Sequence, residues 1–339
     1  MSSSSARALC SIALISALAL TGCATNGGSG GSTSGADGGL TVAVVPKIQG
    51  VPFADAIKRG ADDAAEEFGF TSNFVGPTAA DPSAQADVVR SLMQQGANAI
   101  VVAPNDPDSM GPVLKEAQDR GIAVGTVDTD APDSVRSVFV NQASSAAIGQ
   151  ALADQVLTPM GGSGEFAIVS CGQTASNLNS WIEELKKYTA EKYPDAKIVD
   201  TVYADEDEAN AVSMAKDLIN AHPNLTGLVG MCTPTAPGVA RAVEETGNIG
   251  KIFTTGVGTP NSMAPYLEDG SSSASVLWDV ENLGYLAGWA GYTLASGDEI
   301  AAENEVGRIG KVTYDSSTGE LLLGDPLILT TANVGDYDY

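Results

Sequence analysis

The fold is decided by residues 98–128, which read NAIVVAPNDPDSMGPVLKEAQDRGIAVGTVD. In this stretch a short β-branched run is followed by a proline-containing turn, an amphipathic segment and a second β-branched run. That order is typical of a strand, a helix and a parallel strand. The helix is predicted to stop before Gly121, because glycine readily takes the left-handed conformation that ends a helix.

The same order recurs from Leu40 onward. Residues 226–258, TGLVGMCTPTAPGVARAVEETGNIGKIFTTGVG, repeat it with a similarity that is architectural rather than literal. We therefore predict an α/β fold with two doubly wound parallel-sheet lobes joined by a hinge. The predicted strands cover 40–45, 71–75, 99–102, 122–127, 137–140, 166–170, 197–203, 227–231, 251–255 and 273–278. The predicted helices cover 52–68, 82–95, 107–120, 179–192, 207–221, 237–246, 263–269 and 282–296.

The segment after Gly310 departs from this alternation. It contains three short strand patterns, at 311–314, 320–323 and 327–330, and the first two are separated by the hairpin-type turn SSTG. We expect these strands at an edge of the second lobe. The predicted N-terminal lobe then comprises 40–141 plus 281–306, and the predicted C-terminal lobe comprises 142–280 plus 307–339.

The first 39 residues are typical of a targeting segment followed by a tether. The apolar run from Ala8 to Leu20 is too short for a stable membrane span, and it leads into Leu20-Thr21-Gly22-Cys23. Small residues before a cysteine form a bacterial lipobox, so we expect a signal peptide over 1–22 and lipidation of Cys23. Residues 23–39 are rich in Gly, Ser and Thr, which predicts a flexible tether. The alternative is an ordinary signal peptide with an incidental cysteine. The expected location is extracytoplasmic, with a lipid anchor in the cell membrane.

Charge and composition exclude several classes of function. Asp and Glu number 42 against 17 Lys and Arg, which gives a formal net charge of −25. Such a surface repels phosphates, so we expect no nucleic-acid partner. The strong charge also suits a secreted protein that must stay soluble, and we expect a monomer. The single histidine, His222, lies at a predicted helix end, and no phosphate loop, zinc or EF-hand pattern occurs. We expect no enzyme activity, no cofactor and no metal.

Cys171 and Cys232 both fall at the ends of second-lobe strands. If those strands are neighbours in the parallel sheet, the two cysteines are within reach of a disulfide. The alternative is a pair of free thiols.

Candidate binding residues follow from the fold, because ligands of open α/β sheets bind beyond the carboxyl ends of the strands. In the first lobe we expect ligand contacts from Lys47, Phe53, Asp128 and Thr129. A carboxylate at a strand end can accept two hydroxyl groups, and an aromatic ring can stack on a sugar face. The alternatives are a solvated lysine, a core phenylalanine and an aspartate that caps a turn.

In the second lobe the strand ends also carry amide, hydroxyl and aromatic groups. We expect ligand contacts from Asn177, Trp181, Thr233, Trp278 and Asp279. These residues would face the first-lobe set across a cleft.

The chain from Leu40 to Tyr339 resembles the type I periplasmic binding proteins of the ribose class, nearest the autoinducer-2-binding and rhamnose-binding branches. The resemblance is carried by VPKIQGVPF (45–53), GPT (76–78), NAIVVAPNDPD (98–108), RGIAV (120–124), DTD (128–130), VNQ (140–142), NSW (179–181), GTPNSMAPYLEDG (258–270), LWDV (277–280), GRIGKV (307–312) and NVGDYDY (333–339).

The resemblance implies a substrate-binding protein of an ABC importer, which closes on a small sugar-like ligand and then docks on permease subunits. The lysine and aspartate that hold autoinducer-2 in that family match Lys47 and Asp128. Its Asp-Gln pair falls on Asn177-Leu178, its Pro-x-Ala on Met231-Cys232-Thr233, and the aspartate of ribose-type binders on Val257. The second lobe is therefore expected to be less polar. The alternatives are a lipoprotein receptor that reports ligand to a sensor kinase, and a secreted hydrolase.

Overall fold

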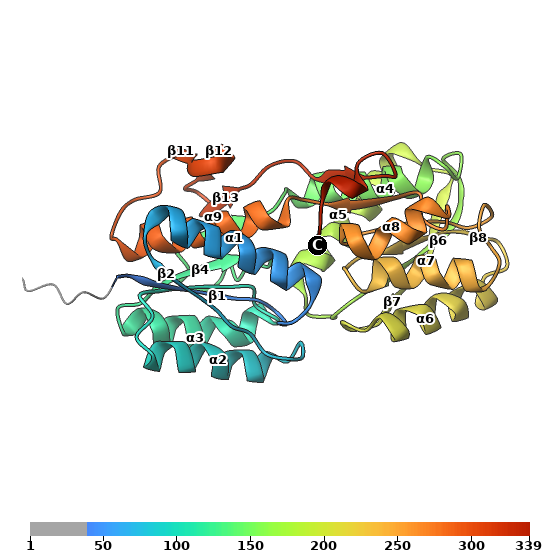
Figure 1. Ribbon diagram of the computed structural model, residues 1–339. Coiled ribbons are helices and arrows are strands. Elements are labelled where there is room, and N and C mark those ends of the chain that lie inside the picture. Colours follow the sequence, from blue (N-terminus) through green and yellow to red (C-terminus); the bar gives the residue numbers. More distant parts are fainter. Residues whose placement is uncertain (1–38) are drawn as a thin grey trace, which may run out of the picture. The chain divides into compact units, whose positions relative to one another are not determined.

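The computed structural model describes residues 39–339 (Figure 1). The expected signal peptide, lipobox and Cys23 lie outside the described residues, as does nearly all of the expected tether. Within residues 39–339, no helix is both long enough and apolar enough to cross a bilayer.

The first lobe is built on an eight-stranded sheet with the order β11-β12-β13-β5-β4-β3-β1-β2. Strands β1 to β5 and β13 run parallel, and at one edge β12 runs antiparallel to both of its neighbours, β13 and β11. The strands are β1 (Thr41–Val45), β2 (Thr71–Phe74), β3 (Ala99–Val102), β4 (Ala123–Val127), β5 (Val138–Asn141), β11 (Glu303–Val306), β12 (Gly310–Asp315) and β13 (Glu320–Leu322).

Alternate residues of a strand face opposite sides of the sheet, and each side of the first sheet is covered by two helices. Val42 and Val44 of β1 belong to the core beneath α1 (Pro52–Phe68) and α9 (Val280–Ala295). Ala43 and Val45 belong to the core beneath α2 (Pro82–Gln94) and α3 (Pro107–Asp119). Figure 1 shows these two helical layers on either side of the sheet.

The second lobe is built on a six-stranded sheet with the order β14-β10-β9-β8-β6-β7. Its strands are parallel except for β14, which pairs antiparallel with β10 at the edge. The strands are β6 (Gly164–Ser170), β7 (Ala196–Tyr203), β8 (Leu225–Gly230), β9 (Phe253–Gly256), β10 (Ala274–Leu277) and β14 (Leu327–Leu329). The helices are α4 (Ser145–Leu157), α5 (Ser176–Lys192), α6 (Glu208–Ala221), α7 (Thr235–Glu245) and α8 (Pro260–Glu268).

The predicted fold class is confirmed, and residues typical of helix ends correctly predicted where several helices begin and end. Helix α1 has the predicted bounds, begins with a proline and ends at Gly69, whose φ of 77° lies in the left-handed region. Asp81 and Asp106 cap α2 and α3 by accepting hydrogen bonds from backbone N–H groups. Helix α4 and strand β11 were not among the predicted elements.

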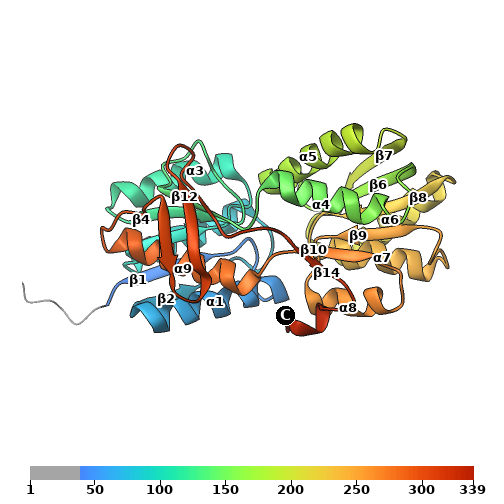
Figure 2. The same cartoon turned by 90° about the horizontal axis from the view of Figure 1, so that it is seen from above.

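The prediction for the C-terminal segment is partly wrong. Only β14 joins the second sheet, whereas β12 and β13 extend the first (Figure 2). Leu321 of β13 is fully buried and pairs with Val140 of β5, and Arg136 donates to the carbonyl oxygen of Thr318 in the preceding turn. Residues 310–322, which were predicted to belong to the C-terminal lobe, therefore belong to the first lobe. A local strand pattern cannot specify which of two sheets it will join.

Candidate functional site

A pocket lies between the carboxyl ends of the two parallel sheets. It holds about 620 Å³ of space free of protein atoms, part of which is open to solvent. Both lobes contribute to its lining, which is mostly apolar with a few charged and polar groups. Seven of the nine predicted ligand residues line it: Lys47, Phe53, Asp128, Asn177, Trp181, Thr233 and Trp278.

Asp128 is the buried acid of the pocket. It directly follows β4, with a φ of 61° in the left-handed region, a conformation that aspartate tolerates better than most residues. Its carboxylate accepts hydrogen bonds from Gln142 Nε2 at 3.2 Å and from Asn177 Nδ2 at 3.5 Å. Burial raises the pKa of Asp128, and the nearby Lys47 ammonium and Thr129 hydroxyl oppose that rise. The carboxyl is therefore held at the pocket by its strand end and by its amide donors.

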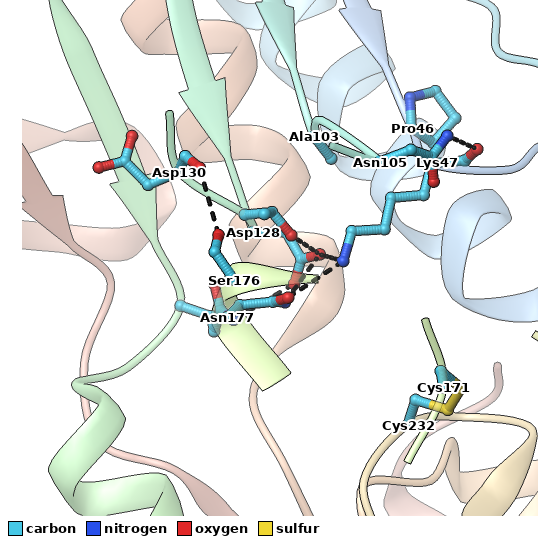
Figure 3. A network of polar contacts seen from close by, with 12 residues as sticks. Pro46, Lys47, Ala103, Asn105, Asp128, Asp130, Cys171, Ser176, Asn177 and Cys232 are labelled. Carbon is cyan, nitrogen blue, oxygen red and sulfur yellow. Dashed lines mark hydrogen bonds and ion pairs between the residues drawn. A yellow bond between two sulfur atoms is a disulfide. The ribbon is translucent and has the colours of Figure 1, made fainter. Parts of the chain in front are cut away.

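Lys47 connects the two lobes. Its ammonium donates to Asn177 Oδ1 at 3.1 Å and lies 3.9 Å from an Asp128 carboxylate oxygen, as Figure 3 shows. The Lys47 side chain is only 14% exposed, so its charge acts in a partly dehydrated setting. Lys47, Asp128 and Asn177 therefore contact one another in all three pairs and form a polar triangle, in which Asn177 comes from the second lobe.

A buried glutamine fixes the loop that carries Lys47. Gln85 of α2 is fully buried, and its side-chain nitrogen donates to the carbonyl oxygens of Pro46 and Ala103 at 3.0 and 2.8 Å. Its side-chain oxygen accepts from the N–H of Asn105, whose own amide donates to the Lys47 carbonyl. The ends of β1 and β3 are therefore tied together beneath the pocket.

Three aromatic rings form an apolar part of the pocket wall. The ring of Trp278 packs edge-on against Trp181 and Phe53, with centroid separations of 5.6 and 5.9 Å. Trp278 is 2% exposed, and its indole N–H has no hydrogen-bond partner among residues 39–339. A buried donor left unpaired costs about 1–3 kcal/mol, so a molecule that accepts this hydrogen bond would be favoured in the pocket.

A disulfide forms part of the second-lobe wall. Strands β6 and β8 are neighbours, and the cysteines that follow them, Cys171 and Cys232, are bonded to each other with their Cα atoms 6.2 Å apart. A carboxylate oxygen of Glu206 lies within 4.8 Å of both sulfurs. Bonded sulfurs are not thiolates, so this cluster offers a metal ion only one charged ligand.

Two predicted ligand residues do not line the pocket. Asp279 instead caps α9, where its carboxylate accepts hydrogen bonds from the N–H and the side-chain amide of Asn282 at 2.8 and 2.9 Å. Thr129 is fully buried, and its hydroxyl lies 3.5 Å from the carboxylate of Asp128. Both follow strand ends as predicted, but Asp279 serves as a helix cap and the Thr129 side chain is buried.

Glu206 lines the pocket and was missed by the sequence analysis. It lies in the loop between β7 and α6, within the acidic run Asp205-Glu206-Asp207-Glu208. Such a run is typical of a solvated surface, and its second member carried no signal that set it apart. Burial raises the pKa of the Glu206 carboxyl, and the Lys47 ammonium opposes this rise.

Comparisons with known proteins agree with this architecture. Residues 42–299 match the family model described as "Periplasmic binding protein domain". The D-ribose/D-allose-binding protein of Pseudomonas aeruginosa is 26% identical over 225 residues, which are 64% of this chain and 68% of that protein. The structure of LsrB from Clostridium saccharobutylicum in complex with AI-2 is 28% identical with a TM-score of 0.84, and the match covers 88% of this chain and 100% of LsrB. An ABC transporter solute-binding protein from Clostridium phytofermentas with bound L-rhamnose is 29% identical with a TM-score of 0.83, and the match covers 88% and 98% of the two chains.

Proposed function

Because the chain belongs to the periplasmic binding protein domain family, we propose that it captures a small sugar-like molecule between its lobes and presents it to an ABC importer. The observation that carries this proposal is the pocket between the two sheets, which is lined by the partly buried Lys47–Asp128–Asn177 triangle and by an aromatic wall. Such a site has few polar groups with fixed positions and a large apolar surface, as small-molecule sites commonly do.

The chemistry of the lining suits a polyhydroxylated ligand. Carboxylate and amide oxygens accept hydroxyl protons, and the Lys47 ammonium donates to hydroxyl or carbonyl oxygens. Trp181 and Trp278 line the pocket, and their apolar ring surface suits the C–H face of a sugar ring. Among the proteins similar to this chain, one is named for binding ribose and allose, and two have structures with bound AI-2 or L-rhamnose. All of these ligands are small oxygen-rich molecules.

The proposed mechanism is closure of the lobes around the ligand. Several hydrogen bonds already cross between the lobes. Figure 3 shows those from Lys47 to Asn177 and from the Ser176 hydroxyl to the Asp130 carbonyl, and the Thr174 hydroxyl also donates to the Asn105 carbonyl. A ligand that contacts both lobes makes its full set of contacts only when they are closed, so binding shifts the population towards the closed form.

The proposed setting is the outer face of the cell membrane. The lipobox Leu20-Thr21-Gly22-Cys23 supports an anchor on Cys23, and the Gly/Ser/Thr-rich stretch after it supports a tether. A tethered, closed binding protein would then meet the permease subunits of its importer.

A thermal-shift screen of the purified mature chain over pentoses, deoxyhexoses, polyols and autoinducer-2 tests the proposal. A ligand at a hundredfold excess over its Kd stabilises the folded state by about 2.7 kcal/mol, which raises Tm by several degrees. Calorimetry and quenching of the pocket tryptophans then measure the affinity of each compound that raises Tm. Binding of none of these compounds, or their chemical conversion by the protein, would contradict the proposal.

A further inference from the structure

Glu206 holds an unpaired carboxylate at the pocket. The residue is partly buried, and its side chain takes part in no hydrogen bond or ion pair with any residue of the described chain, 39–339. One carboxylate oxygen lies within 4.8 Å of both sulfurs of the Cys171–Cys232 disulfide, and bonded sulfurs have no proton to donate. The wall behind Glu206 therefore leaves the carboxylate without a donor.

The charges of the pocket do not balance. The charged residues that line it are Lys47, Asp128 and Glu206, which is one cation against two carboxylates. The Lys47 ammonium faces Asp128 and donates to Asn177, so its contacts are to those two residues. The Glu206 carboxylate is the member of this set that makes no hydrogen bond or ion pair within residues 39–339, although the Lys47 ammonium acts on its charge from farther away.

We propose that Glu206 is the specificity-determining acceptor of the second lobe. It accepts hydrogen bonds from ligand groups that face this lobe, prefers a protonated amine to a hydroxyl there, and rejects a carboxylate or phosphate. This inference rests on the proposed function, because it assigns a role within the same pocket.

The physical reason is the loss of water when the lobes close on a ligand. A carboxylate that loses its hydration without gaining donors is strongly destabilised, so a ligand must supply them. Hydroxyl groups supply donors, and an ammonium group supplies donors and an opposite charge. An anionic group supplies neither and adds repulsion.

The experiment compares wild type with Glu206→Gln, which keeps the size of the side chain and removes its charge. The matched control is Asp205→Asn, which removes a charge from the adjacent exposed residue that does not line this pocket. The neutral probes are L-rhamnose, D-ribose and autoinducer-2, and the matched series are D-glucose, D-glucosamine and D-glucuronate with their galactose counterparts. Affinities come from calorimetry of the mature chain.

In wild type we expect an amino sugar to bind at least tenfold more tightly than its uronate, with the neutral sugar between them. Glu206→Gln should reduce that ratio to threefold or less and weaken the tightest neutral probe about tenfold, whereas Asp205→Asn should change neither. If Glu206→Gln fails to fold, Glu206→Asp keeps the charge, withdraws the carboxylate by one methylene and should still lower the ratio.

Two results would overturn the inference in different ways. If a neutral probe binds wild type and Glu206→Gln equally well, or if the uronate binds as tightly as the amino sugar, Glu206 does not set specificity and the proposed function stands. Binding of none of the probes to wild type would overturn the proposed function and this inference with it.

Discussion

Asp128→Asn should abolish most of the ligand affinity while leaving the fold intact. The substitution keeps the size and shape of the side chain, and asparagine tolerates the left-handed backbone that residue 128 adopts with its φ of 61°. Asparagine keeps one oxygen for the Asn177 amide, and its new NH2 replaces the oxygen to which Gln142 donates. A flip of the Gln142 amide then offers its unpartnered oxygen to that NH2, so the hydrogen bonds around the position can be restored.

The magnitude follows from the charge that is removed. A hydrogen bond to a charged group contributes about 1.5–3 kcal/mol, and 1.4 kcal/mol is a factor of ten in Kd, so one lost charge-assisted bond to the ligand weakens binding about 10- to 150-fold. The substitution also removes the carboxylate charge that lies 3.9 Å from the Lys47 ammonium, which then keeps only its hydrogen bond to Asn177. This loss weakens ligand binding further. Stability should change by only about 1 kcal/mol, because burial already raises the pKa of Asp128 and disfavours its charged form.

Calorimetry with the tightest compound of the screen measures the affinity, and thermal unfolding without ligand measures the stability. Asp87→Asn is the matched control, because its side chain is 80% exposed and lies on the outer surface of α2. An affinity within threefold of wild type would refute a direct role of the Asp128 carboxylate. A large fall in Tm for Asp128→Asn would instead show that this carboxylate serves the fold.

Four further predictions test other parts of the structure. Replacing both Cys171 and Cys232, which are 61 residues apart in sequence, by serine should lower the free energy of unfolding by about 4 kcal/mol, and an unchanged denaturant midpoint would contradict a stabilising disulfide. Without ligand, Glu206→Gln should have a higher Tm than wild type at pH 7. A raised carboxyl pKa in the folded state means that wild-type stability falls as pH rises above the ordinary value of 4.5, so the gain in Tm should vanish at pH 3. A Tm difference that does not vary with pH would argue against this effect. Trp278→Phe should weaken ligand binding about 2- to 13-fold, because it removes the unpartnered indole N–H, and unchanged calorimetry would exclude that group as a ligand donor. Cys23→Ala should release the protein from the membrane fraction in its native host, and retention there would rule out a lipid anchor on Cys23.

The fold was predictable because its signals are local and repeat along the chain. Proline or aspartate at helix starts and glycine after helix ends place α1, α2 and α3 within one residue of their observed bounds. The family resemblance seen in the sequence is also confirmed by the match over residues 42–299. The incorrect prediction concerned a contact between residues far apart in sequence. Strand β13 joins the first sheet, where Leu321 is buried beside β5, and nothing in the sequence of β13 itself specifies that partner.

The site was predictable to the extent that strand ends define it. Asp128 and Trp278 follow β4 and β10 directly, and Lys47 comes two residues after β1, so parallel-sheet geometry alone brings them to the pocket. Side-chain direction within a turn is not determined by that geometry, and Asp279 therefore caps a helix one residue beyond Trp278. Glu206 reaches the pocket from a loop, where an acidic residue in an acidic run is typical of a solvated surface.

The way the C-terminal strands are shared between the sheets sets an order of assembly during synthesis. When the chain has been made as far as Leu277, every strand of the second sheet exists except β14, but the first sheet still lacks β11, β12 and β13. Helix α9, which covers β1 of that sheet, is also still to come. The lobe that begins first is thus completed only after residue 322, and the other lobe closes its edge a few residues later at β14. Both sheets are therefore completed only near the end of translation. A chain that crossed a membrane during synthesis would remain incompletely folded until almost all of it had emerged.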